Sequence, residues 1–219
     1  MRMRPLKIIS GGQTGVDQGA LIGAHTVKAS FANNMYDEYL PKDERARDLS
    51  GFILYGGTAP KGYMTEEGPQ KALLKDGYNL KESYSSYYPV RTETNVMDAD
   101  GTIVIQWKES RGCRLTINMC AKHKKPCLVN PESFEEIIDW IEEHDINIIN
   151  VAGHRKSAYP TRAQEYARQL ILQLLCIFYL GDKYVADSSI LAFFPIPIKR
   201  SQDGEASADD ESHEDRDCE

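Results

Sequence analysis

The stretch Ile8-Ile9-Ser10-Gly11-Gly12-Gln13-Thr14-Gly15-Val16-Asp17 joins a short apolar run to a glycine-rich turn and then to a helical pattern. It predicts a strand, a tight loop and a helix N-terminus. Thr14 would cap the helix, and Asp17 in the first turn would complete a reciprocal capping pair with it. Three glycines within five residues permit positive φ angles and let a ligand approach without meeting a Cβ. The stretch is neither GxGxxG nor a P-loop. Two interpretations remain open: an anion site at the positive end of the helix, and a plain strand-to-helix turn.

The charge of the chain is unevenly distributed along the sequence. Its 219 residues carry a formal net charge of -7 and are 41% hydrophobic, enough for one sizeable core. Residues 203–219 contain nine acidic residues and one arginine, so residues 1–202 have a net charge of +1. This nearly neutral body lacks the basic field that nucleic-acid binding requires, and we expect no nucleic-acid partner. A small anionic ligand needs only local positive groups.

The cysteine and apolar patterns argue against a structural metal and against a membrane span. The five cysteines include no CxxC pair, and Cys120 and His123 have no second pair to complete a zinc site. An odd number of cysteines and the lack of a signal peptide favour a reducing cytoplasm. The longest apolar stretch, residues 170–180, contains Gln173 and is too short to cross a bilayer.

Apolar strand patterns alternate with helical patterns along most of the chain. Strands are expected near residues 8–9, 51–55, 102–105, 126–129 and 147–153, and helices near 16–28, 91–96, 114–123, 133–144 and 166–178. Ser133 is a candidate cap of the 133–144 helix. This alternation predicts an α/β fold, a Rossmann-like three-layer α/β/α sandwich with a mainly parallel sheet. In such sheets ligands bind at the carboxyl ends of the strands.

Four glycine-bearing turns should therefore lie at one edge of the sheet. They are Gly11–Gly15, Gly56–Gly62, Arg111–Gly112 and Gly153–Arg155. Residues 64–88 are irregular and rich in tyrosine, which is typical of a loop that packs on the domain or stacks on a planar ligand. We expect one domain over residues 1–180, with a surface insertion at 26–50, an extension at 181–202 and a disordered acidic tail at 203–219.

Several separated motifs occur in the order found in one known family. They are Ile8–Asp17, Gly56-Gly57 with Pro60-Lys61-Gly62, Arg91-Thr92 with Asn95-Val96, Asp98 with Asp100, Leu115-Thr116, Lys125-Pro126 and Asn150–Gly153 with Arg155. Over roughly residues 6–175 the chain resembles the molybdenum cofactor carrier family of the Rossmann-like SLOG superfamily. The superfamily also includes the lysine-decarboxylase-like cytokinin phosphoribohydrolases. Their glycine-glycine-x-glycine-threonine motif with a downstream glutamate is not evident here.

The resemblance implies a cytoplasmic protein, often a homo-oligomer, that holds a phosphate-bearing pterin or nucleotide-like ligand. Molybdenum cofactor (molybdopterin) would be its cargo, stored or delivered to molybdoenzyme recipients rather than turned over. The alternative is a nucleotide-processing hydrolase of the phosphoribohydrolase type. The chain departs from the family pattern at the insertion over residues 26–50, at Arg111 and Cys113 in the third loop, and at His154.

The candidate ligand-binding residues come from these loops and from the residues that follow them. Backbone groups and the Thr14 hydroxyl would bind phosphate, while Lys61, Arg91 and Arg155 would supply positive charge. Asp100 would orient a ribose or pterin, act as a general base, or merely shape a turn; Asn95 would bind the ligand or tie loops together. The full candidate set is Gly11, Gly12, Gln13, Thr14, Gly15, Gly57, Lys61, Gly62, Arg91, Asn95, Asp100, Gly112, Gly153 and Arg155, with no catalytic residue and no metal ligand assigned.

Overall fold

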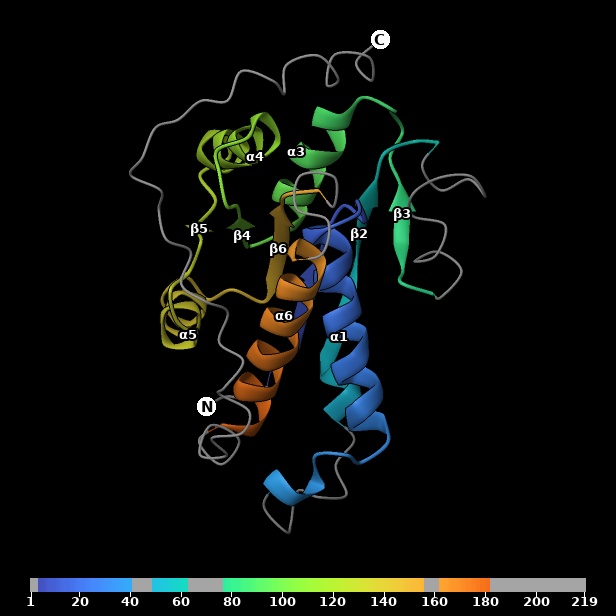
Figure 1. The fold of residues 1–219 in the computed structure, drawn as a ribbon, viewed down its shortest axis with the longest axis vertical. Coiled ribbons are helices and arrows are strands. Elements are labelled where there is room, and N and C mark those ends of the chain that lie inside the picture. Colours follow the sequence, from blue (N-terminus) through green and yellow to red (C-terminus); the bar gives the residue numbers. More distant parts are fainter. Residues whose placement is uncertain (1–3, 41–48, 63–76, 156–161, 182–219) are drawn as a thin grey trace.

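A parallel six-stranded sheet forms the centre of the described part of the chain (Figure 1). The computed structural model describes residues 4–40, 49–62, 77–155 and 162–181. The strands are β1 (Leu6–Ile9), β2 (Ile53–Ala59), β3 (Leu80–Glu82), β4 (Gly101–Ile105), β5 (Cys127–Val129) and β6 (Ile148–Gly153). Their order is β3-β2-β1-β6-β4-β5. Residues 182–202 of the predicted extension and the whole acidic tail lie outside the described residues.

In the described ranges, five α-helices cover the two faces of this sheet. They are α1 (Val16–Ala32), α3 (Tyr88–Asp98), α4 (Arg111–Lys122), α5 (Phe134–Glu143) and α6 (Ala163–Leu180). Helices α1 and α6 pack side by side on one face, where Figure 1 shows them in front, and α3 packs with α4. The three-layer Rossmann-like α/β/α fold expected from the sequence is confirmed.

The main hydrophobic core lies between the sheet and helices α1, α5 and α6. Alternate strand residues such as Ile8, Ile103 and Ile149 point into it and are fully buried. The opposite strand face, toward α3 and α4, is more polar: Asn150 Nδ2 lies 3.3 Å from Thr102 Oγ1, and both residues are buried. As expected, the Ser133 hydroxyl caps α5 by accepting the Glu136 N–H at 3.1 Å.

The segment predicted as an insertion contributes to the core at both of its ends. Helix α1 continues to Ala32, past its expected end at Lys28, and short 3₁₀ turns follow at Asp37–Tyr39 and Leu49–Phe52. Phe31, Leu40 and Leu49 are buried in the main core. The expectation of a surface loop is therefore wrong for residues 26–32, 40 and 49, while residues 41–48 lie outside the described part.

Strand β3 lies within the segment expected to be irregular. It has three residues, two of them exposed, and it pairs with Gly57–Ala59 of β2. Strand β2 in turn runs through Gly56 and Gly57, where a loop was expected. A Cβ on Gly57 would lie 2.0 Å from the carbonyl oxygen of Ser10, so this glycine permits close contact with the end of β1.

Candidate functional site

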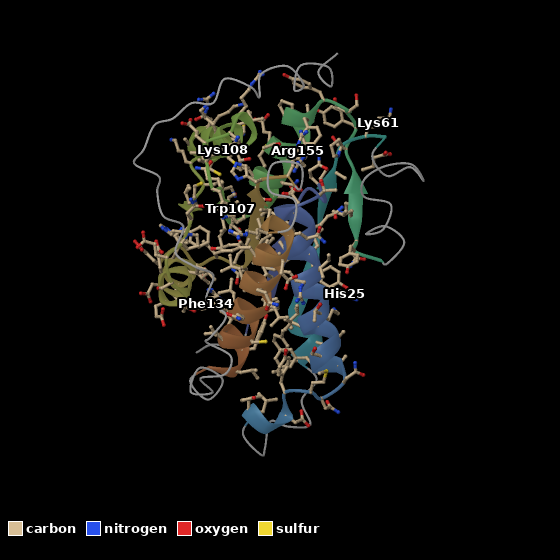
Figure 2. All side chains as sticks on the ribbon, in the orientation of Figure 1. His25, Lys61, Trp107, Lys108, Phe134 and Arg155 are labelled. Atoms are coloured by element: carbon tan, nitrogen blue, oxygen red, sulfur yellow. The ribbon has the colours of Figure 1, made fainter. Side chains whose placement is uncertain are left out.

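The loops that follow the strands meet at one end of the molecule. Because the sheet is parallel, the glycine-rich loop after β1, the loop after β4 and the turn after β6 share its carboxyl edge. Figure 2 shows Lys61, Lys108 and Arg155 at this end, whereas His25 and Phe134 lie lower along the helices. Helices α1, α3, α4 and α6 also begin here, so their positive ends face the same edge.

Hydrogen bonds within the loop and to the first turn of α1 hold the glycine loop after β1. Gly12 and Gly15 adopt φ angles of 72° and 99°. The Gln13 N–H reaches the Asp17 carboxylate at 3.4 Å, and the Thr14 N–H reaches the Gln13 side-chain oxygen at 3.0 Å. Gly15, with no side-chain cap, occupies the N-cap position of α1, so the expected Thr14–Asp17 capping pair is wrong. The Asp17 carboxylate turns toward Gln13 and Arg91 instead.

Arg91 and Asp17 form a buried ion pair directly behind this loop. Arg91 Nη1 lies 3.2 Å from Asp17 Oδ2, and the side chains are only 10% and 5% exposed. Burial raises the pKa of Asp17, while the Arg91 guanidinium, the Gln13 N–H and Arg155 oppose that rise. A Cβ on Gly11 would lie 1.7 Å from Arg91 Nη1. The space left by the missing side chain of Gly11 is therefore filled by Arg91.

Tyr88 links the glycine loop to two arginines. Its hydroxyl is hydrogen-bonded to the side-chain amide of Gln13. The guanidinium carbons of Arg91 and Arg155 lie 4.7 Å and 5.0 Å from its ring centroid, within the range of a cation–π contact. Arg155 is exposed, unlike Arg91. The site thus has an aromatic ring, a buried paired cation and an exposed cation beside the loop.

The loop after β6 brings His154 against the end of β4. The His154 Nδ1 accepts the Trp107 N–H at 3.1 Å, and the two rings stack with centroids 5.8 Å apart. Burial lowers the pKa of His154; the charge of Lys108 adds to this effect and a hydrogen bond with the Lys108 backbone opposes it, so the neutral imidazole is favoured. The His154 carbonyl also accepts the Val16 N–H at 3.1 Å, which joins this turn to the start of α1.

Two buried side-chain atoms of Arg91 and Gln106 at this edge have no hydrogen-bond partner among the described residues. Within the described ranges, Arg91 Nε and Gln106 Oε1 are buried and make no hydrogen bond. The backbone of Gln106 is held by the Asn130 amide, at 2.8 Å for its N–H and 2.7 Å for its carbonyl. A buried polar group without a partner is costly, and a ligand oxygen or N–H is one way to satisfy it.

Asp100 does not belong to this group of residues. It precedes β4 and therefore lies at the amino edge of the sheet, opposite the glycine loops. Its carboxylate accepts the N–H groups of Asn147 and Ile148 at 3.0 Å and 2.9 Å. The prediction of a ligand-binding Asp100 is wrong, because the carboxylate fixes the start of β6.

Three other candidates contact the protein's own backbone. The Asn95 amide accepts the Thr58 N–H and donates to the Thr58 carbonyl, both at 2.9 Å, which ties α3 to β2. A Cβ on Gly153 would lie 2.2 Å from the Ile105 carbonyl oxygen, so this glycine packs β6 against β4. Gly57 packs β2 against β1 in the same way. Gly57 and Gly153 thus let neighbouring strands pack closely, and Asn95 joins helix α3 to the sheet.

The remaining candidates, Lys61, Gly62 and Gly112, follow strands β2 and β4 at the carboxyl edge of the sheet. Lys61 is exposed after β2, and the Gly62 N–H donates to the Glu82 carboxylate at 2.6 Å. Gly112 lies in the first turn of α4, where a Cβ would have no neighbouring atom within 4 Å.

Tyr88 is the residue of this cluster that the sequence pattern did not single out. The structure groups Gln13, Arg91 and Arg155 most closely, and it does so through Tyr88. The helix was expected to begin at Arg91, whereas α3 begins three residues earlier at Tyr88. With that earlier start, Tyr88 and Arg91 lie three residues apart on one face of the helix. This spacing is the sequence signal that would have indicated Tyr88 as part of the cluster.

A family model, the circularly permutated YpsA SLOG family, matches residues 8–175. The chain belongs to this family. The family match covers every strand and helix of the described fold except the first residues of β1 and the last turns of α6. It also confirms the resemblance to the SLOG superfamily that the ordered motifs indicated.

A solved structure gives an independent comparison for this SLOG family member. It is the crystal structure of a "Putative molybdenum carrier protein" from Syntrophus aciditrophicus SB, with 33% sequence identity and a TM-score of 0.55. The alignment covers 82% of this chain and 98% of the other. The comparison with curated proteins gave no match.

Two other kinds of site are absent from the described residues. Within those ranges, no three His, Cys, Asp or Glu residues gather as metal ligands would. In the same part of the chain, no helix is both long and apolar enough to cross a lipid bilayer.

Proposed function

We propose that this protein binds a phosphate-bearing pterin or nucleotide-like anion at the carboxyl edge of its sheet and carries it without turnover. The observation that carries the proposal is the arrangement around Tyr88, which joins Gln13 of the glycine loop to the guanidinium groups of Arg91 and Arg155. Planar guanidinium groups suit phosphate oxygens, and the N-terminal end of α1 adds positive potential. Membership of a SLOG family and the name of the similar solved structure, a "Putative molybdenum carrier protein", support a carrying role.

Within this class we propose molybdenum cofactor as the cargo and molybdoenzymes as recipients. The support is the name of the solved structure, a "Putative molybdenum carrier protein", which is 33% identical to this chain in sequence. The protein need not supply a metal site, because the pterin dithiolene of the cofactor holds the molybdenum. The hydrolase alternative relied on Asp100 as a base, and that residue lies at the opposite edge.

The test is binding by the full chain. The protein is purified from a cell that makes molybdenum cofactor, and the co-purifying pterin is measured by fluorescence after oxidation, with molybdenum measured by mass spectrometry. Purified protein is also titrated with GMP, pyrophosphate and released cofactor by calorimetry. Stoichiometric cofactor, or saturable binding of these anions without product formation, supports a carrier. Absence of binding at millimolar concentrations, or release of free base from GMP, contradicts it.

A further inference from the structure

The two arginines beside Tyr88 have different surroundings. Arg91 is 9% exposed, and its Nη1 is held by Asp17 at 3.2 Å in the space above Gly11. Arg155 is exposed, and its guanidinium carbon lies 5.0 Å from the centroid of the Tyr88 ring. One guanidinium is therefore enclosed by the protein, and the other is open to solvent at the same aromatic ring.

The charges of the cluster point to the same distinction. Asp17 and Arg91 are opposite charges in contact, so together they present little net field to a ligand. Arg155 is close enough to Asp17 to help stabilise its carboxylate, yet it lies outside the buried pair. The positive charge that the cluster offers to solvent is thus that of Arg155. An incoming phosphate meets this charge first, whereas Arg91 Nη1 is already paired with Asp17 and Arg91 Nε is buried.

We propose that Arg155 makes the ion pair with the ligand's phosphate and that Tyr88 is the positioning residue that holds Arg155 for this contact. Arg91 then serves to fix Asp17 and the glycine loop. This inference rests on the proposed function, and it assigns different roles to two arginines that sequence motifs treat alike. The Gln13 amide, bonded to the Tyr88 hydroxyl, connects the orientation of the ring to the loop.

The experiment measures the affinity of the full chain for inorganic pyrophosphate by calorimetry, at several salt concentrations. Arg155→Gln should weaken binding by about 10-fold to 100-fold, as expected for a lost charge-assisted hydrogen bond, and should flatten the salt dependence. Arg168→Gln is the matched control, because Arg168 is paired with Glu165 on α6. That variant removes the same charge and should leave the affinity within about 2-fold.

Variants of Tyr88 test the positioning role. Tyr88→Leu should weaken pyrophosphate binding by about 2-fold to 5-fold, because the cation–π contact is lost. Tyr88→Phe should keep the affinity of the wild type, because the aromatic ring remains. In an Arg155→Gln background, Tyr88→Leu should have no further effect on affinity if Tyr88 acts through Arg155. Circular dichroism and urea unfolding verify that each variant is folded.

The outcomes separate this inference from the proposed function. If the wild type binds none of pyrophosphate, GMP and released cofactor, the proposed function fails. If the wild type binds pyrophosphate and Arg155→Gln binds it equally well, only the role of Arg155 is overturned. If Tyr88→Leu weakens binding equally in both backgrounds, Tyr88 acts independently of Arg155 and the positioning role is wrong.

Discussion

Replacement of Gly11 by alanine should break the buried ion pair that supports the glycine loop. The new Cβ would lie 1.7 Å from Arg91 Nη1, 2.3 Å from Arg91 Cζ and 2.9 Å from Asp17 Oδ2. Such distances are far below van der Waals contact, so the guanidinium must leave its position. Arg91 is a long side chain and can move, but Asp17 stays behind on α1 with its side chain 5% exposed.

The magnitude follows from the charge that is left behind. Removing one partner from a buried ion pair costs roughly 3–5 kcal/mol, because the other charge remains uncompensated. Protonation of Asp17 relieves part of this cost, so we expect Gly11→Ala to lower the free energy of unfolding by about 3 kcal/mol. At roughly 2–4 °C for each kcal/mol in a domain of this size, Tm should fall by about 6–12 °C.

The assay is equilibrium urea unfolding followed by circular dichroism, with thermal unfolding as a second measurement. Gly112→Ala is the matched control: nothing lies within 4 Å of a Cβ there, and an alanine in α4 should stabilise the protein by up to about 1 kcal/mol. In an Arg91→Met background the cost of Gly11→Ala should become much smaller, because the guanidinium is gone. If Gly11→Ala unfolds at the same urea concentration as the wild type, the reasoning about Gly11 and Arg91 is refuted.

Three further predictions concern other parts of the fold. Burial lowers the pKa of His154 below 6.5, so the free energy of unfolding should fall as the pH drops below that value. In urea unfolding, His154→Gln should remove this pH dependence, and an unchanged dependence would exclude His154 as its source. Asn95→Ala should cost about 2–3 kcal/mol in the same assay by leaving the Thr58 N–H and carbonyl without the amide, and a loss under about 0.5 kcal/mol would contradict this role. Leu49→Ala should cost about 2–5 kcal/mol, because Leu49 is fully buried; a neutral effect would favour a surface loop at this position.

Much of the fold was predictable because its strands and helices have strong local patterns. Continuous apolar runs marked β4 and β6, and the cap at Ser133 marked α5, since these signals depend on neighbours in the sequence. Strand β3 carries Lys81 and Glu82 and is held by pairing with β2, so its conformation depends on a distant segment. Leu40 and Leu49 likewise show no clear period, and only packing in the main core makes them core residues.

The sequence predicted the edge of the sheet at which the candidate site lies more accurately than the contacts between the residues of the site. Strand order and parallel direction bring the glycine loop and Arg155 to one edge, as the alternation indicated. The order of motifs also indicated the family without any three-dimensional comparison. Asp100 is the exception in position, because it precedes β4 and residues before a parallel strand lie at the amino edge rather than the carboxyl edge.

The sequence by itself determined that residues 8–17 form a strand, a glycine loop and the start of a helix in a parallel α/β fold. These features follow from local backbone preferences and apolar spacing, which neighbouring residues specify. Only the tertiary structure decided that Gly11 makes room for Arg91, that Asp17 pairs with it, and that Tyr88 contacts both Gln13 and Arg155. These contacts join residues that are far apart in the sequence, and chain folding alone brings them together.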